Sequence, residues 1–178
     1  FSEAFWQSAA ATFGGSVFYG GLLGGMVTGG LYYRKKRFPN DFVDVMAVSV
    51  PLFHTFGRIG CFLGGCCYGI ECSVGFTYTQ NPITIANGVR RFPVQLLEAL
   101  FCFALFLVLF SLLRRGLYKG RLLAVYLCVY AVGRFFLEFL RGDSYRGFLF
   151  GLSTSQIISI LLLIGTVVFL LTDQKRRK

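Results

Sequence analysis

Five long apolar stretches set the strongest limit on how this chain of 178 residues can fold. An α-helix needs about 20 such residues to cross the hydrocarbon core of a bilayer, and 55% of the chain is hydrophobic. We therefore predict an all-α, polytopic transmembrane bundle of about five spans, organised as a single domain over residues 1–178. The predicted spans are Phe13–Tyr33, Phe42–Phe56, Val94–Leu113, Leu122–Leu140 and Ser153–Leu171.

The basic residues predict the orientation of these spans. The formal net charge is +10, and most of the positive charge lies in three clusters that share one side of the membrane if the spans alternate. Because cytoplasmic loops are enriched in Lys and Arg, we expect that side to be the cytoplasm, with the C-terminus on it. The clusters then serve as topology signals, which argues against a nucleic-acid partner. They are Arg34–Arg37, Arg114–Arg121 and Lys175–Lys178.

Two arginines stand in or beside apolar spans, where topology does not explain them. Arg58 follows the second span, and Arg134 lies inside the fourth with Glu138 four residues later, on the same helix face. One interpretation is an ion pair that simply permits burial of Arg134. The other is that Arg58 and Arg134 converge on an anion, because guanidinium stays charged and forks onto phosphate. In a membrane, that anion is predicted to be a phospholipid headgroup.

The segment "HTFGRIGCFLGGCCYG" around Arg58 is rich in glycine. Glycine lets the backbone approach a ligand closely, and irregular backbone is tolerated at membrane depth where it lines a cavity. This favours a re-entrant glycine-rich segment that lines a headgroup pocket. Close helix packing is the alternative use of the same glycines.

Four cysteines gather near the predicted outer face: Cys61, Cys66, Cys67 and Cys72. They are compatible with a disulfide, for example from Cys66 or Cys67 to Cys72, with free thiols, or with a reactive Cys61 near Arg58. A zinc site is less favoured, because paired Cys-x-x-Cys spacing is missing. His54, the single histidine, is either a catalytic base or a hydrogen-bonded packing residue.

Four segments in order resemble the prolipoprotein diacylglyceryl transferases of bacteria, over nearly the whole chain. "GRIGCFLGGCCYG" is similar to the family signature Gly-Arg-x-Gly-Asn-Phe-x-Asn-Gly-Glu-x-x-Gly, and "RRFPVQLLEA" to Arg-His-Pro-Ser-Gln-Leu-Tyr-Glu. "GRFFLEFLRGD" is similar to Arg-Phe-x-x-Glu-Phe-x-Arg, and "LSTSQIISI" to a Leu-Ser-x-x-Gln stretch. The resemblance implies the C-terminal five-helix part of that fold, in the bacterial cytoplasmic (inner) membrane with its active site toward the outer leaflet.

The resemblance also implies a reaction: transfer of a diacylglyceryl group from phosphatidylglycerol to the lipobox cysteine thiol of a prolipoprotein signal peptide, with no cofactor or metal. It assigns catalytic roles to Arg58, Arg134, Tyr19 and Glu138. It assigns substrate binding to Gly57, Gly60, Cys61, Gly69, Arg91, Gln95, Glu98 and Arg141.

Several family positions hold other residues in this chain. Tyr19 stands where the family usually has a histidine, Cys61 replaces a signature asparagine, Cys66 replaces the signature glutamate, and Phe92 replaces a second histidine. A tyrosine can donate a hydrogen bond to phosphate but is a poor base at neutral pH. Two alternatives follow: a divergent phospholipid-using transferase with another acceptor or a thiol-redox role, and a non-catalytic lipid-binding membrane protein.

Overall fold

A computed structural model describes residues 28–29, 31–32, 35, 40–81, 86–142, 148–149 and 151–176. The chain divides after Pro39 into two compact units, and every helix and strand named below belongs to the second. The first predicted span, Phe13–Tyr33, falls almost wholly outside the described residues, and so does Tyr19. The single domain over residues 1–178 therefore stays a prediction.

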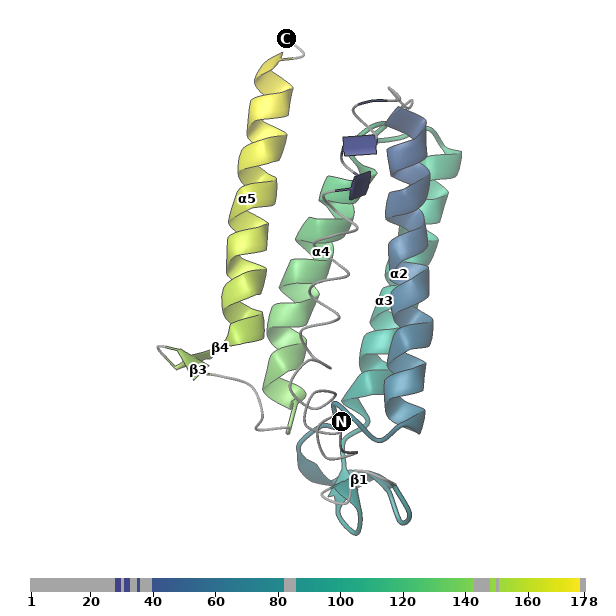
Figure 1. Cartoon of the computed structure of the whole chain (residues 1–178), viewed down its shortest axis with the longest axis vertical. Coiled ribbons are helices and arrows are strands. Elements are labelled where there is room, and N and C mark those ends of the chain that lie inside the picture. Colours follow the sequence, from purple (N-terminus) through teal and green to yellow (C-terminus); the bar gives the residue numbers. More distant parts are fainter. Residues whose placement is uncertain are drawn as a thin grey trace, which may run out of the picture. The chain divides into compact units, whose positions relative to one another are not determined.

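Four long helices build the second unit (Figure 1). Each is long and apolar enough to cross a membrane. This confirms a helical membrane bundle, with four candidate spans in the described part of the chain rather than about five. The last three follow the predicted spans closely. The helices are α2 (Asn40–Leu63), α3 (Val94–Arg114), α4 (Leu122–Leu137), which runs into the 3-10 turn η2 (Glu138–Leu140), and α5 (Thr154–Arg176).

Helix α2 is longer than predicted. It passes Phe56 and continues to Leu63, so Gly57 and Gly60 lie within regular helix. The prediction of a re-entrant path was therefore wrong for residues 57–63. The physical reason is that backbone groups in hydrocarbon are satisfied most readily inside a helix. The interspersed apolar side chains, such as Ile59 and Phe62, outweigh the weak helix propensity of two glycines.

A glycine-based cap ends α2. Gly65 adopts a left-handed φ of 65°, its N–H donates to Phe62 O at 3.2 Å, and the Cys66 N–H donates to Cys61 O at 3.1 Å. These two bonds define a Schellman motif, in which glycine carries the left-handed position. The Gly64–Gly65 pair therefore stops the helix and folds Cys66 back over the last turn, toward Cys61.

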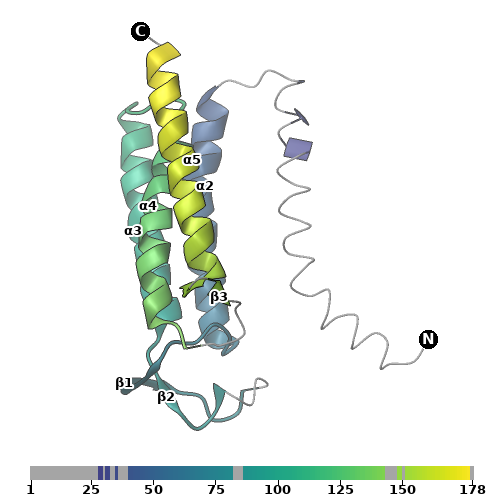
Figure 2. The same ribbon diagram turned by 90° about the vertical axis from the view of Figure 1, so that its left-hand side faces the viewer.

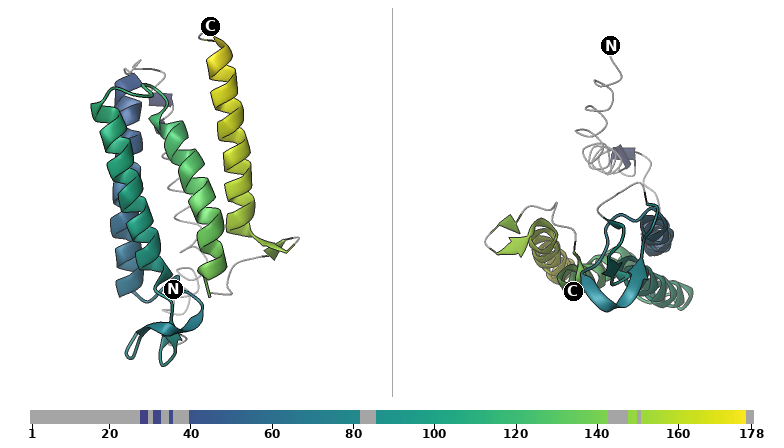
Figure 3. Two further views of the ribbon diagram at one scale, coloured as in Figure 1. Left: turned by 180° about the vertical axis from the view of Figure 1, so that it is seen from behind. Right: turned by 90° about the horizontal axis from the view of Figure 1, so that it is seen from below.

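The helices pack so that α4 lies between α5 and the α2–α3 pair (Figures 1 and 3). Their shared core contains Ala47, Val48, Leu105, Leu109, Leu122 and Tyr126. Large apolar side chains face outward from the same helices, including Phe53, Leu100 and Leu161. Outward apolar faces of this kind suit contact with lipid rather than water.

Irregular segments and short strands gather at the end of the bundle where α2 stops and α5 begins (Figures 1 and 2). The polar segment predicted between the second and third spans contains β1 (Glu71–Thr77), which pairs antiparallel with β2 (Arg90–Arg91). Before α5, β3 (Phe148–Leu149) pairs with β4 (Leu152–Ser153). We call this the strand end of the bundle.

Asp44 ties the helices together at the opposite end. Its buried carboxylate accepts hydrogen bonds from the backbone N–H of Gly120 at 2.5 Å and of Leu122 at 3.2 Å. Leu122 is the first residue of α4, so Asp44 on α2 caps the start of another helix. A carboxylate there also interacts favourably with the positive end of the helix dipole.

We expect Asp44→Ala to lower the free energy of unfolding by about 2 kcal/mol, because it leaves two backbone donors without their acceptor. Thermal unfolding of the purified protein in detergent measures this loss. Ser49→Ala is the matched control, since Ser49 is exposed and bonds only within its own helix, to Val45 O. Equal midpoints for the two variants would contradict the capping role.

Candidate functional site

The first of two intramembrane ion pairs joins α2 to α3. Arg58 Nη2 lies 3.0 Å from Glu98 Oε1, and the side chains are 17% and 2% exposed. Tyr130 on α4 donates a hydrogen bond to the same carboxylate oxygen at 3.3 Å. Because the group is largely shielded from water, these contacts hold the guanidinium in one position. Three helices thus meet at Glu98.

The second pair lies within α4 and reaches α5. Arg134 Nη2 is 2.7 Å from Glu138 Oε2 and donates to Ser155 Oγ at 3.1 Å. Arg134 Nη1 is buried and has no hydrogen-bond partner among the described residues. Leaving a buried donor unpaired costs about 1–3 kcal/mol. This nitrogen is therefore the best-placed protein atom for contact with an anionic ligand.

Tyr130 connects the two pairs. It bonds to Glu98 and lies one helical turn before Arg134 on α4. It is also close enough to interact electrostatically with both Arg58 and Arg134. Arg58 and Arg134, the two arginines singled out in the sequence, therefore both lie in the neighbourhood of Tyr130. The predicted i, i+4 pair of Arg134 and Glu138 is present, whereas their contact with an anion stays a prediction.

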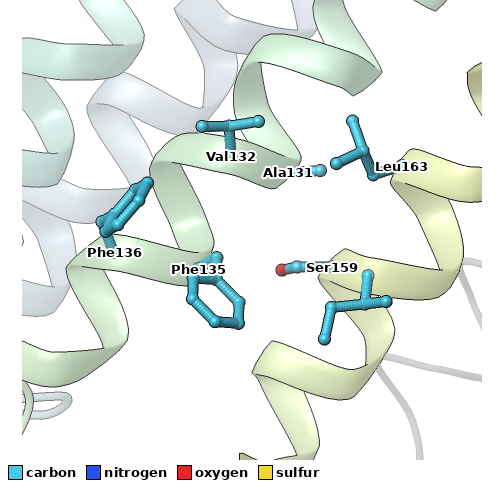
Figure 4. Close-up of a pocket in the computed structure, with 7 residues that line it drawn as sticks. Ala131, Val132, Phe135, Phe136, Ser159 and Leu163 are labelled. Carbon is cyan, nitrogen blue, oxygen red and sulfur yellow. The ribbon is translucent and has the colours of Figure 1, made fainter.

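An apolar pocket opens between α4 and α5, and Phe135, the residue after Arg134, lines it (Figure 4). The one polar side chain lining it, Ser159, donates its hydroxyl hydrogen to Ser155 O at 2.8 Å. The hydroxyl donor is therefore satisfied within the helix, and a ligand need not supply a hydrogen-bond acceptor for it. A pocket of this chemistry fits a hydrocarbon chain. Its lining residues are Ala131, Val132, Phe135, Phe136, Ser159, Ile160 and Leu163.

The "LSTSQ" stretch positions Ser155 against Arg134. Ser153 Oγ accepts from the Gln156 N–H at 3.2 Å, and Gln156 Oε1 accepts from the Ser153 N–H at 3.0 Å. This reciprocal pair is a capping box, which satisfies two backbone donors at the start of α5. Ser155 lies between the two capping residues, so the box fixes where its hydroxyl meets the guanidinium.

Gly69 sits where three segments of the strand end cross. It forms a backbone bridge with Arg141, and its neighbour Ile70 receives a hydrogen bond from Phe92 and donates one to Leu140. A Cβ on Gly69 would collide with Phe92 O and lie 2.9 Å from Leu140 O. Steric exclusion therefore requires glycine at this signature position, because no larger residue fits between the crossing segments.

The other predicted binding residues take different positions. The Arg91 guanidinium lies 4.3 Å from the centre of the Tyr68 ring, and buried Gln95 donates to Cys66 O at 2.8 Å. Arg141 joins the crossing at Gly69 through its backbone. In contrast, apart from the helix's own backbone, no described residue lies within 4 Å of a Cβ built on Gly57 or Gly60. Packing among the described residues therefore does not explain these two glycines.

None of the six cysteines forms a disulfide, so the structure contains none of the bridges considered above. Cys72 stays apart, bonded to Val74 O at 2.6 Å. The sulfur atoms of Cys61, Cys66 and Cys67 instead lie within 4.8 Å of one another, each half-buried. Burial raises the pKa of the Cys66 thiol, with a further contribution from Cys67. Cys66 is therefore protonated at neutral pH in the structure as it stands.

His54 takes up a packing position. Its Nδ1 lies 3.2 Å from the Tyr126 hydroxyl, and its ring centre is 5.0 Å from that of Tyr130. These contacts agree with the hydrogen-bonded packing residue considered from the sequence. They place the imidazole against Tyr126 and Tyr130.

Sequence reasoning missed Tyr130 and Ser155. Tyr130 carried a usable signal, since it precedes Arg134 by four residues and so shares its helix face. Ser155 carried none, because its contact with Arg134 depends on how α5 packs against α4. Glu98 was predicted from the family segment, but its pairing with Arg58 was not.

A bundle of apolar helices with two arginines in its interior defines a polytopic membrane protein with a polar intramembrane site. The family model described as prolipoprotein diacylglyceryl transferase matches residues 1–172. The chain belongs to this family.

Relatives named phosphatidylglycerol–prolipoprotein diacylglyceryl transferase support that assignment. The protein of Clostridium tetani is 40% identical over 87% of this chain and 63% of its own length. The second such protein of Clostridium perfringens is 40% identical over 86% and 60%. That of Clostridioides difficile is 32% identical over 93% and 64%. The chain thus spans less than two thirds of the length of these relatives.

Proposed function

We propose that the protein transfers a diacylglyceryl group from phosphatidylglycerol to the lipobox cysteine of a prolipoprotein. The acceptor sulfur attacks the diacylglycerol carbon next to the phosphate, and the bond from that carbon to the phosphate oxygen breaks. A thioether forms, and glycerol phosphate leaves with the electron pair and takes up the thiol proton. The names of the relatives support both substrates.

The single observation that carries this proposal is the buried Nη1 donor of Arg134, which has no hydrogen-bond partner among the described residues and belongs to the helix that lines an apolar pocket. A phospholipid has matching parts: an anionic phosphate for the guanidinium and hydrocarbon for the pocket. As the carbon–oxygen bond breaks, negative charge grows on the phosphate. A preorganised guanidinium in a site that excludes water stabilises this charge more than water does.

The remaining residues have supporting roles in this proposal. Arg58 is the second phosphate contact, and Glu98 and Glu138 are positioning residues that orient the two arginines. Tyr19, outside the described residues, donates a hydrogen bond to the phosphate. Gly57, Gly60, Cys61, Arg91, Gln95 and Arg141 border the path of the substrates, around the Gly69 crossing.

The proposed location is the bacterial inner membrane, with several passes through it. The loop from α3 to α4 and the end of α5 lie at the same end of the bundle (Figure 1), and both carry basic residues. By the positive-inside rule this end is cytoplasmic. The strand end and the active site then face the outer leaflet, where the signal peptide of a translocated prolipoprotein is accessible.

The test uses the native protein in detergent with phosphatidylglycerol and a lipobox peptide. Mass spectrometry should detect a diacylglyceryl group on the peptide cysteine. A peptide with serine in place of that cysteine should gain no mass, and Arg58→Ala should abolish the gain. Arg115→Ala, at an exposed arginine outside the site, is the matched control and should retain it. No mass gain with wild-type protein would refute the proposal.

Tyr130→Phe should slow transfer about tenfold, because it removes one hydrogen bond to the carboxylate that orients Arg58. Initial rates of thioether formation measure this. The control is Tyr126→Phe, which removes a hydroxyl bonded to His54 one turn earlier on α4 and should leave the rate within about twofold. Equal rates for both variants would remove Tyr130 from the site.

A further inference from the structure

The helix cap at the end of α2 assembles three thiols. Cys61 lies on the last turn of the helix, and the Schellman motif places Cys66 and Cys67 back against it. Cys67 itself has a left-handed φ of 57°, a conformation that is unfavourable for a residue other than glycine. The Gln95 side chain holds this turn by its hydrogen bond to Cys66 O.

The spacing of the sulfur atoms suits one shared ion. Three thiolates around a tetrahedral zinc ion, each about 2.3 Å from the metal, stand about 3.8 Å apart. The three sulfur atoms here lie within 4.8 Å of one another, so closure by at most about 1 Å brings them to that spacing. A disulfide needs about 2.05 Å between two sulfur atoms and leaves the third thiol unused.

The type of ligand decides the class of ion. The group consists of three thiols, with no carboxylate or imidazole in it. Soft thiolate sets select zinc-like or monovalent copper ions over magnesium or calcium. Arg58, one turn before Cys61, is close enough to interact electrostatically with Cys61 and Cys67. Its positive charge favours the anionic complex that three thiolates form with a divalent ion.

We propose that Cys61, Cys66 and Cys67 bind a thiophilic divalent cation of the zinc class, with a fourth coordination position open. Three protein ligands and one open position are the pattern of catalytic rather than structural zinc. The sequence spacing did not favour such a site. The cap geometry supplies it, because it folds Cys66 and Cys67, three and four residues beyond the end of α2, back against Cys61 on the last helical turn.

The open coordination position could take the acceptor cysteine of the lipobox, an assignment that rests on the proposed function. A thiol that coordinates such a metal loses its proton, so the acceptor cysteine would be held as a thiolate near Arg58. With the metal bound, the thiol proton would pass to solvent before the sulfur attacks the diacylglycerol carbon. Glycerol phosphate would then leave with the electron pair as an anion and take up a proton from solvent rather than from the thiol. The thioether product is a neutral, weaker ligand and can leave.

Cobalt(II) is the probe for this site. The native protein, purified without added metal and with a phosphine as reductant, should develop thiolate-to-cobalt absorption that saturates at about one ion per chain and disappears when zinc is added. Cys61→Ser should lose most of this absorption. Cys72→Ser and Cys128→Ser, whose thiols lie outside the cluster, should retain it. Unchanged elution and thermal midpoint without metal establish that Cys61→Ser is folded.

Two results would overturn the metal site: no cobalt absorption in the wild-type protein, or equal absorption in Cys61→Ser. If two of the three thiols react with an alkylating agent only after reduction, and no metal binds, the cluster forms a disulfide rather than a metal site. A lipobox peptide should alter the cobalt spectrum, whereas its serine counterpart should not. An identical spectrum with both peptides would overturn the acceptor role alone. Because metal binding is measured without lipid, failure of the transfer assay is distinguishable from failure of the metal site.

Discussion

Replacing Arg134 with glutamine is expected to reduce diacylglyceryl transfer about a thousandfold, the scale of losing a donor aimed at developing charge. The Arg134 side chain is 9% exposed and pairs with Glu138, and its buried Nη1 has no hydrogen-bond partner among the described residues. No neutral side chain reproduces both the charge and the forked donors. The rate of thioether formation in detergent measures the loss.

A second variant separates loss of chemistry from loss of folding. Arg134→Gln leaves the buried Glu138 without its ion partner, which costs about 3–5 kcal/mol in comparable buried pairs. The double variant Arg134→Gln/Glu138→Gln removes both charges and should recover most of that stability, while transfer stays absent. A double variant that retained more than about a tenth of the wild-type rate would contradict direct phosphate binding by Arg134.

The second large effect is expected at Gly69. Gly69→Ala should lower the free energy of unfolding by about 3 kcal/mol or prevent folding, because a Cβ there collides with Phe92 O. Thermal unfolding and yield of folded protein from membranes report this. The crossing it occupies also positions Arg141, so transfer should fall with it.

Gly165→Ala is the matched control for this prediction. Gly165 lies in α5, and nothing lies within 4 Å of a Cβ built on it. Alanine should be neutral or stabilise the helix by up to about 1 kcal/mol. A Gly69→Ala variant as stable as Gly165→Ala would show that the crossing tolerates a side chain, contrary to the structure.

The helices were predictable because their signals are local. Apolar runs of the right length place α3, α4 and α5, and four-residue spacing alone places Glu138 beside Arg134. The end of α2 was harder, since glycines suggest a broken helix while the apolar residues between them favour its continuation to Leu63.

Contacts between helices could not be predicted from the same information. The pairing of Arg58 with Glu98, and of Arg134 with Ser155, depends on how far the packed helices are shifted along their axes relative to one another. The thiol cluster was partly predictable from the sequence. The Gly64–Gly65 pair is a visible signal for a helix cap, but only the geometry of that cap brings Cys66 and Cys67 to Cys61.

The most direct test of the account is the balance of the two products in one reaction. Phosphatidylglycerol and a lipobox peptide are incubated with the native protein, and peptide thioether and free glycerol phosphate are both quantified over time. The proposed transfer should give equal amounts of the two products, and Arg58→Gln should lose both. Phospholipid cleavage without thioether, or equal product formation by Arg58→Gln, would contradict it.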